Sequence, residues 1–199
     1  EQIMVKVAIS PVSEDGAREN MAKEMPSWPS LEKVARNAEQ AWEKELGKVK
    51  IQSESETVKR IFYTALYHTM IAPSEFCDVN GQYRGADGQV HENPGHTSYT
   101  TYSLWDTYRA QMPLLSILHP EKMTGIINTM LNIFDEQGRL PVWHLWGNET
   151  DCMVGNPGLI SVADALVKGD TDIDPMRAYK AVRETAMNKG RGNGFRMEY

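Results

Sequence analysis

Two segments of this 199-residue chain place tryptophans beside carboxylates. In SLWDTYRAQMPLL, Trp105 precedes Asp106, and in LPVWHLWGNETDCM, Trp143 and Trp146 precede Glu149. Tryptophan rings can stack on the C–H faces of sugar rings, and carboxylates accept hydrogen bonds from sugar hydroxyls. A pocket that combines an apolar wall with a few convergent polar groups suits a carbohydrate. The two segments therefore predict a sugar-binding site.

The first segment has two interpretations. In a helix, Asp106 and Arg109 are three residues apart and lie on one face. The functional interpretation is that Trp105 and Asp106 project into a pocket, where Asp106 holds sugar hydroxyls and Arg109 keeps it ionised and oriented. The structural interpretation is an ion pair within the helix, beside a core tryptophan. The spacing leaves both open.

The second segment continues with a polar run, Gly147-Asn148-Glu149-Thr150, in a stretch that we expect to be a loop. Loops between rigid elements are where ligands are often bound, so Glu149 and Thr150 are candidates for the same sugar pocket. The alternative is a turn in which Asn148, Glu149 or Thr150 only caps the element that follows.

The histidines do not predict a metal site. The spacing of His91, His96 and His144 fits no zinc pattern, and we expect His68 and His119, in or at the ends of helices, to be structural. The DVNG run is similar to the start of a calcium loop. However, the position that must be glycine is Tyr83, so a turn is the better interpretation.

Composition sets further limits. The hydrophobic fraction of 41% and the charged fraction of 24% are ordinary for a globular protein. The net charge of −6 argues against nucleic acid as a partner, and no apolar run is long enough to cross a bilayer. No secretion signal is visible in the opening EQIMVKVAIS. Cys77 and Cys152 form neither a disulfide framework nor a metal-binding pair, and we expect two separate thiols.

Hydrophobic periodicity and capping residues predict a mainly α chain of antiparallel helix pairs. An apolar, β-branched run predicts a strand at 3–9, and turn signals predict a small β-excursion at 76–90. A short strand at 49–51 and an irregular loop at 140–155 complete the assignment. The helices are expected at 13–25, 31–46, 58–70, 103–118 with a kink or a new start at Pro113, 120–137, 159–167 and 175–188.

Five runs of the sequence resemble glycoside hydrolase family 92, the calcium-dependent exo-acting α-mannosidases of bacteria. The runs are Phe62–Gly85 (FYTALYHTMIAPSEFCDVNGQYRG), Tyr99–Glu121 (YTTYSLWDTYRAQMPLLSILHPE), Leu140–Trp143 (LPVW), Gly147–Gly155 (GNETDCMVG) and Val162–Gly169 (VADALVKG). They occur in order, and the resemblance covers nearly the whole chain.

The resemblance implies an N-terminal β-sandwich joined to an (α/α)6 helical toroid. Residues 1–12 would be the last strand of the sandwich or the linker from it, and 13–199 the first part of the toroid. The implied activity is removal of terminal α-linked mannose, in particular α-1,2-linked mannose, from glycans such as N-glycans, by inverting hydrolysis with calcium. The implied location is periplasmic or secreted, and the implied partners are a mannose-containing glycan and the remainder of the same enzyme.

The resemblance also implies roles for individual residues. Trp105 and Asp106, with Arg109, would line the subsite for the terminal mannose, and Glu149, Thr150 and Cys152 would lie near it. The catalytic acid and base and most calcium ligands of the family lie in motifs that would follow Tyr199, so no residue here is assigned to catalysis or to metal binding. The chain departs from the family where Gly155-Asn156-Pro157-Gly158 replaces a GYHS-type run.

Two alternatives remain at this point. The first is a helical carbohydrate-binding or scaffold module without turnover, and the second is a different (α/α)6 hydrolase, such as a glucosidase. If a toroid is only partly present, we also expect apolar helix faces to be exposed where other helices would pack.

Overall fold

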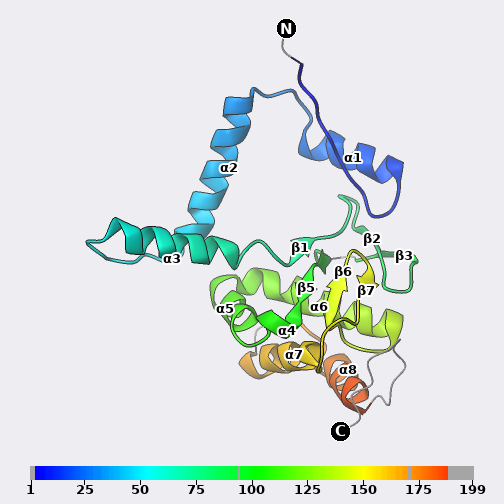
Figure 1. The fold of residues 1–199 in the computed structure, drawn as a ribbon. Helices are drawn as coiled ribbons and strands as arrows, with labels where there is room; N and C mark the ends of the chain where they lie inside the picture. Colours follow the sequence, from blue (N-terminus) through cyan, green and yellow to red (C-terminus); the bar gives the residue numbers. More distant parts are fainter. Residues whose placement is uncertain (1–2, 94, 170–171, 188–199) are drawn as a thin grey trace.

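The computed structural model describes residues 3–93, 95–169 and 172–187. Helices dominate it, as the hydrophobic periodicity predicts (Figure 1). They are α1 (Glu14–Glu24), α2 (Leu31–Leu46), α3 (Glu56–His68), α4 (Leu104–Thr107), α5 (Gln111–Leu118), α6 (Pro120–Gln137), α7 (Pro157–Lys168) and α8 (Pro175–Met187).

Local capping explains where several of these helices begin or end. The side chains of Ser13, Ser30 and Ser55 each accept a hydrogen bond from a backbone N–H three residues further on, which satisfies a donor that the helix leaves free. At the other end, α6 and α7 stop at Gly138 and Gly169, whose φ angles of 83° and 70° favour glycine. These signals are local. The sequence predicts the start after Ser30 and the ends at Gly138 and Gly169 correctly, whereas it places the start of α3 two residues too late, at 58.

Among the described residues, the strands are two or three residues long and form three small antiparallel sheets. The strands β1 and β4 pair with each other, β2 and β3 form the predicted excursion, and the third sheet has the order β5-β6-β7. Their bounds are β1 (Ser74–Glu75), β2 (Gln82–Arg84), β3 (Val90–Glu92), β4 (Tyr99–Thr100), β5 (Tyr102–Ser103), β6 (Trp143–Leu145) and β7 (Asn148–Glu149).

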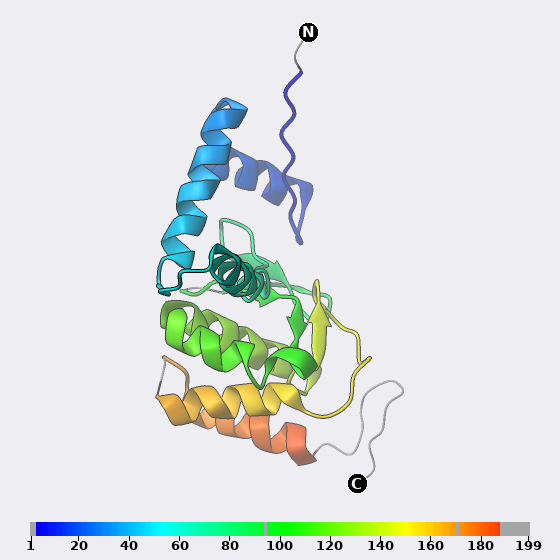
Figure 2. The same cartoon turned by 60° about the vertical axis from the view of Figure 1, so that its left-hand side comes forward.

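The hydrophobic core lies among α5, α6, α7 and α8 together with β4 and β5. Helix α6 is its centre, with nine buried residues, and Ile127, Met130 and Leu131 are fully buried. Figure 2 shows α5 and α6 as one layer and α7 and α8 as the next, with the short strands at one side. These antiparallel pairs agree with a mainly α architecture.

Helices α1 to α3 form an extension above this core (Figure 1). Helix α2 has no buried residue, and apolar side chains such as Leu31, Val34 and Ile61 are exposed. Apolar side chains are exposed on α7 and α8 as well, including Val167 and Met176. The expected exposed apolar helix faces are therefore present.

Three local predictions are wrong. Residues 49–51 are not a strand, because within the described residues no neighbouring strand pairs with them. Residues 3–9 pair with no strand among the described residues either, and the strand that the resemblance assigns to a β-sandwich stays a prediction. The segment 103–118 is not one kinked helix, since it divides into β5, α4 and α5 with a break at 108–110. The stretch 140–155 is not wholly irregular, because it contains the β6–β7 hairpin.

Candidate sugar-binding site

The pairing of β5 with β6 brings the two tryptophan–carboxylate segments together. Ser103 lies directly opposite Trp143, and Tyr102 lies opposite His144. Residues directly opposite each other in a sheet share a face, and the faces alternate along a strand. Tyr102 and His144 are buried with ring centroids 6.5 Å apart, so Ser103 and Trp143 occupy the outer face.

Asp106 is anchored to this outer face. The Ser103 hydroxyl donates a hydrogen bond to Asp106 Oδ2 at 2.9 Å, across the start of α4. Trp105 and Trp143 are half-buried, and Asp106 is exposed. A carboxylate has acceptor capacity beyond one hydrogen bond, so Asp106 can accept further hydrogen bonds from a ligand. Ser103 was not identified from the sequence, and its position three residues before Asp106 is the signal that could have found it.

Arg109 does not pair with Asp106. Its guanidinium lies over the ring of Tyr108, 5.2 Å from the centroid, while Asp106 bonds to Ser103. The reason is that α4 ends at Thr107, so Arg109 is outside the regular helix that would have kept it on the same face. The ion pair that both interpretations of the sequence assumed is therefore wrong.

Trp146 belongs to a different surface. Trp146 and Gly147 are the two-residue turn between β6 and β7, with φ angles of 54° and 75°, and type I′ hairpin turns require positive φ at both positions. The turn packs against other elements, because the Trp146 N–H donates to Thr100 Oγ1 at 2.7 Å and its ring meets Phe76 edge-on at 5.8 Å. Trp143, by contrast, is at the opposite end of the hairpin.

Glu149 organises the backbone beneath Trp143. Its two carboxylate oxygens accept hydrogen bonds from the N–H groups of Val142 (2.8 Å), Trp143 (2.9 Å) and Asp151 (3.1 Å). This is not the cap of a following element that the turn interpretation expects, because two of the three donors precede Glu149 in the chain. Glu149 therefore holds the segment that carries Trp143, whatever further contact it makes.

Thr150 and Cys152 follow at the same end of the hairpin. The Thr150 hydroxyl donates to the Trp143 carbonyl at 2.8 Å and lies 3.3 Å from Cys152 Sγ, and Cys152 is exposed. Asp151 forms an ion pair with Arg139, which links the residues before β6 to those after β7. Arg139 and Asp151 were not identified from the sequence, although their opposite charges flank the loop.

The histidines of the described residues take separate, structural positions. His91 lies 3.0 Å from Asp87, and His119 lies between α5 and α6 with its Nδ1 2.9 Å from Lys48 Nζ. Burial lowers the pKa of His144 to about 4, which keeps the ring neutral. No group of three or more histidines, cysteines or acidic residues in the described part of the chain could hold a metal ion.

The Cys77 thiol is partly shielded from solvent. Its side chain is half-buried, and burial raises the pKa of the thiol above its ordinary value. Both Cys77 and Cys152 are free thiols in the structure.

A family model described as the glycosyl hydrolase family 92 catalytic domain matches residues 16–199. The chain belongs to glycosyl hydrolase family 92. The match begins within α1 and includes both segments of the candidate site. The residues of the site therefore lie within the part of the chain that matches the family.

Solved members of family 92 share this fold. An α-mannosidase of Bacteroides thetaiotaomicron, whose structure is also known in complex with mannoimidazole, is 41% identical with a TM-score of 0.86, over 92% of this chain and 24% of its own. An inverting mannosidase of the same organism is 28% identical with a TM-score of 0.84, over 92% of this chain and 25% of its own.

A curated relative is an uncharacterised secreted glycosidase of Arthroderma benhamiae. It is 29% identical over 190 residues, which are 93% of this chain and 20% of the relative. The chain thus spans about a fifth to a quarter of the length of the relatives that it matches.

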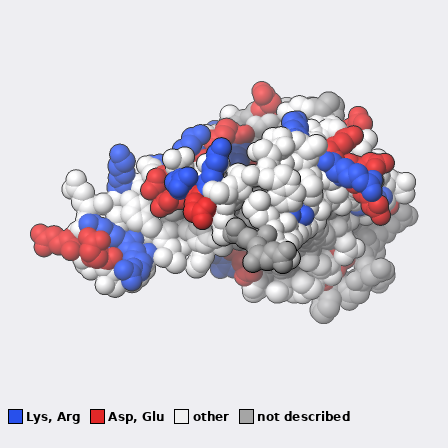
Figure 3. All heavy atoms as spheres, turned by 90° about the horizontal axis from the view of Figure 1, so that it is seen from above, with Lys and Arg blue, Asp and Glu red and all other residues white. Residues whose placement is uncertain are grey.

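The surface of this family 92 chain carries charges of both signs. On the face seen from above, acidic and basic side chains are interspersed (Figure 3). Among the described helices, none is both long enough and apolar enough to span a membrane.

Proposed function

We propose that this chain is the part of a family 92 α-mannosidase that forms one wall of the pocket for the terminal mannose. The observation that carries the proposal is the β5–β6 register, which sets Trp143 opposite the serine that anchors Asp106. The family membership and the similarity to two solved mannosidases of this family support the substrate class.

Within that wall, the tryptophans and the aspartate have different roles. Trp105 and Trp143 supply apolar surface for the C–H face of the sugar, and both are only half-buried. Asp106 accepts hydrogen bonds from sugar hydroxyls, and Ser103 fixes its rotamer before the sugar arrives. Thr150 and Cys152, exposed at the end of the β6–β7 hairpin, border the same pocket.

Neither Asp106 nor Glu149 is proposed as the acid or the base. Inverting hydrolysis needs two carboxyl groups on opposite sides of the scissile bond, about 6.5–9.5 Å apart, with room for a water molecule. The Glu149 carboxylate already accepts three backbone hydrogen bonds, and Asp106 is assigned to binding. The acid and base would therefore come from other parts of the enzyme. We also propose that the whole enzyme inverts the anomeric configuration and prefers α-1,2-linked mannose.

Calcium dependence is also part of the proposal. The described residues do not by themselves fit a calcium site, because no cluster of three or more acidic, histidine or cysteine side chains occurs among them. Most of the coordination would come from the remainder of the enzyme. For this reason, no step proposed for this chain uses the ion.

The domain organisation and the location follow the same proposal. Residues 1–12 would lead from a β-sandwich into the helical domain, which is consistent with the exposed apolar side chains of Ile3, Val5 and Val7. The similarity to a secreted glycosidase favours a secreted or periplasmic enzyme.

The test is an assay of the whole protein on α-1,2-mannobiose, followed by NMR of the anomeric protons of the released mannose. We expect β-mannose first, as inversion requires, and loss of activity when a calcium chelator is added. Release of α-mannose first would contradict inversion, and activity insensitive to the chelator would contradict the role of calcium. Binding without any hydrolysis would instead favour a non-catalytic carbohydrate-binding module.

A further inference from the structure

A cavity of about 390 Å³ lies where the α2–α3 extension meets the helical core. Its lining comes from α2, the segment after α3, β1, β4, α5 and α6. The volume is within the range of small-molecule sites, which is about 300–1,000 Å³. Nothing in the proposed mannose pocket uses these residues.

The walls of the cavity are mostly apolar and partly aromatic. Trp42, half-buried on α2, and Tyr99, buried on β4, line it together with aliphatic side chains. The Trp42 ring is steadied by Tyr67, which meets it edge-on with centroids 4.6 Å apart. An indole fixed in this way offers a rigid surface for the apolar face of a ligand.

The charged groups at the cavity are paired, so the cavity is close to neutral. Glu45 lies 3.0 Å from Lys48, and Glu75 lies 3.8 Å from Lys122. Glu75 and Lys122 are largely exposed and free to exchange their partner for a ligand hydroxyl. This balance favours a neutral polar ligand over an anion or a cation.

His119 also lines the cavity. It is 3% exposed, and its Nδ1 lies 2.9 Å from Lys48 Nζ, 3.4 Å from Glu121 Oε1 and 3.5 Å from Glu45 Oε2. Nε2 has no hydrogen-bond partner among the described residues. Because Nε2 is buried from solvent, it does not face the cavity, and His119 contributes to the wall as a packed ring.

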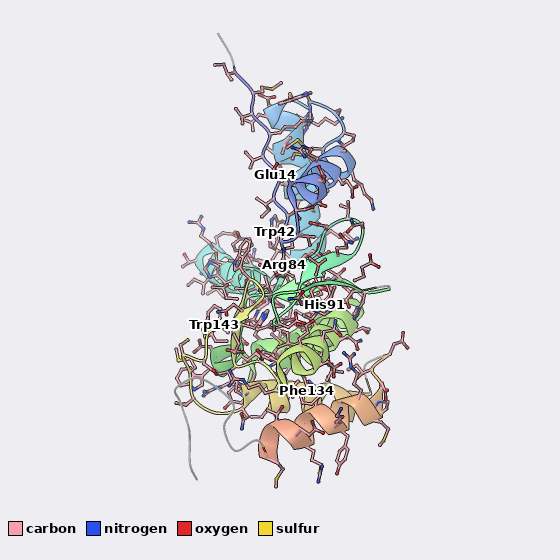
Figure 4. The ribbon with its side chains drawn as sticks, turned by 90° about the vertical axis from the view of Figure 1, so that its right-hand side faces the viewer. Glu14, Trp42, Arg84, His91, Phe134 and Trp143 are labelled. Carbon is pink, nitrogen blue, oxygen red and sulfur yellow. The ribbon has the colours of Figure 1, made fainter. Side chains whose placement is uncertain are left out.

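We propose that this cavity is a second carbohydrate site, which binds a neutral pyranose between Trp42 and Tyr99 with its hydroxyls on Glu75 and Lys122. The site is separate from the proposed mannose pocket, because Trp42 is on α2 and Trp143 is on β6 (Figure 4). It requires no hydrolysis, so it does not depend on the proposed function.

The test follows the indole N–H signals of the tryptophans by ¹H–¹⁵N NMR during titration with methyl α-D-mannopyranoside. The Trp42→Phe variant assigns the Trp42 signal. We expect that signal to move and saturate, and Glu75→Gln to weaken the binding on the order of tenfold, because a hydrogen bond to a charged group is lost. The matched control is Glu24→Gln, which replaces an exposed residue at the end of α1 and should leave the affinity for the sugar unchanged.

Asp106→Asn separates the two sites. It should leave the movement of the Trp42 signal intact while reducing that of Trp105. A Trp42 signal that stays fixed up to about 100 mM sugar, roughly a hundred times a millimolar dissociation constant, would overturn the proposal. The proposal would also be overturned if the unmodified protein and the Glu75→Gln variant bound the sugar with equal affinity. Loss of the Trp42 response in the Asp106→Asn variant would overturn it as well.

Discussion

The Glu149 carboxylate accepts the backbone N–H of Trp143 at 2.9 Å and thereby fixes a tryptophan that is six residues earlier in the chain. The same carboxylate holds the N–H of Val142 at 2.8 Å. An aromatic wall of a sugar site is useful only if it is held in place before the ligand binds. Glu149 provides that support from beneath the hairpin.

Replacing Glu149 by alanine should therefore destabilise the hairpin and the site together. We expect the free energy of unfolding to fall by about 2 kcal/mol, because backbone N–H groups lose their acceptor, and sugar binding to weaken in parallel. Urea denaturation and mannoside titration measure the two effects. Asn148→Ala, at the exposed neighbouring position of β7, is the control. Unchanged stability in Glu149→Ala would contradict the supporting role.

Asp106→Asn should act on binding and leave the fold intact. Asp106 is exposed, so the free energy of unfolding should change by no more than about 0.5 kcal/mol. Binding of methyl α-mannoside should weaken about tenfold, because the amide accepts sugar hydroxyls less strongly than a carboxylate. Calorimetric titration measures this, with Asp15→Asn on α1 as the control. Equal affinity would remove Asp106 from the site.

His144 should make stability depend on pH. Its pKa of about 4 in the folded protein is below the ordinary 6.5, so between these values the unfolded chain binds a proton that the folded chain does not. Stability should therefore fall as the pH is lowered from about 6.5 to about 4, by up to about 3 kcal/mol. This loss should level off below that range.

The measurement compares urea denaturation at about pH 7 and about pH 4.5. The His144→Phe variant cannot take up the proton. Its free energy of unfolding should therefore fall less than that of the unmodified protein between the two pH values. His68→Gln, at the exposed end of α3, should behave like the unmodified protein. An identical pH dependence in His144→Phe would show that His144 does not contribute.

Asp78 should hold α1 against the rest of the protein. It is 3% exposed, and it accepts hydrogen bonds from the Ser10 hydroxyl at 2.6 Å and from Asn20 Nδ2 at 2.8 Å. Asp78→Ala leaves both donors without their acceptor, at a cost of about 1–3 kcal/mol each. Hydrogen exchange should show faster exchange in α1 and unchanged exchange in α6. Exchange in α1 as slow as in the unmodified protein would contradict this role.

The helices could be predicted from the sequence because their signals are local. Ser13 and Ser30 mark where α1 and α2 begin, and Gly138 marks where α6 ends, because a cap involves only residues within one turn. The same is true of Pro120 at the start of α6. The two tryptophan–carboxylate segments could also be selected, since residue type alone gives their chemistry.

Only the tertiary structure decided how those segments meet. The β5–β6 pairing joins Ser103 to Trp143 across 40 residues, between strands too short to show a period of two. The β6–β7 turn places Trp146 at a positive φ, which is uncommon for a residue with a side chain, so the sequence predicted a loop there. The Ser103–Asp106 hydrogen bond spans only three residues, but the β5–β6 pairing, which is non-local, decides that it lies opposite Trp143.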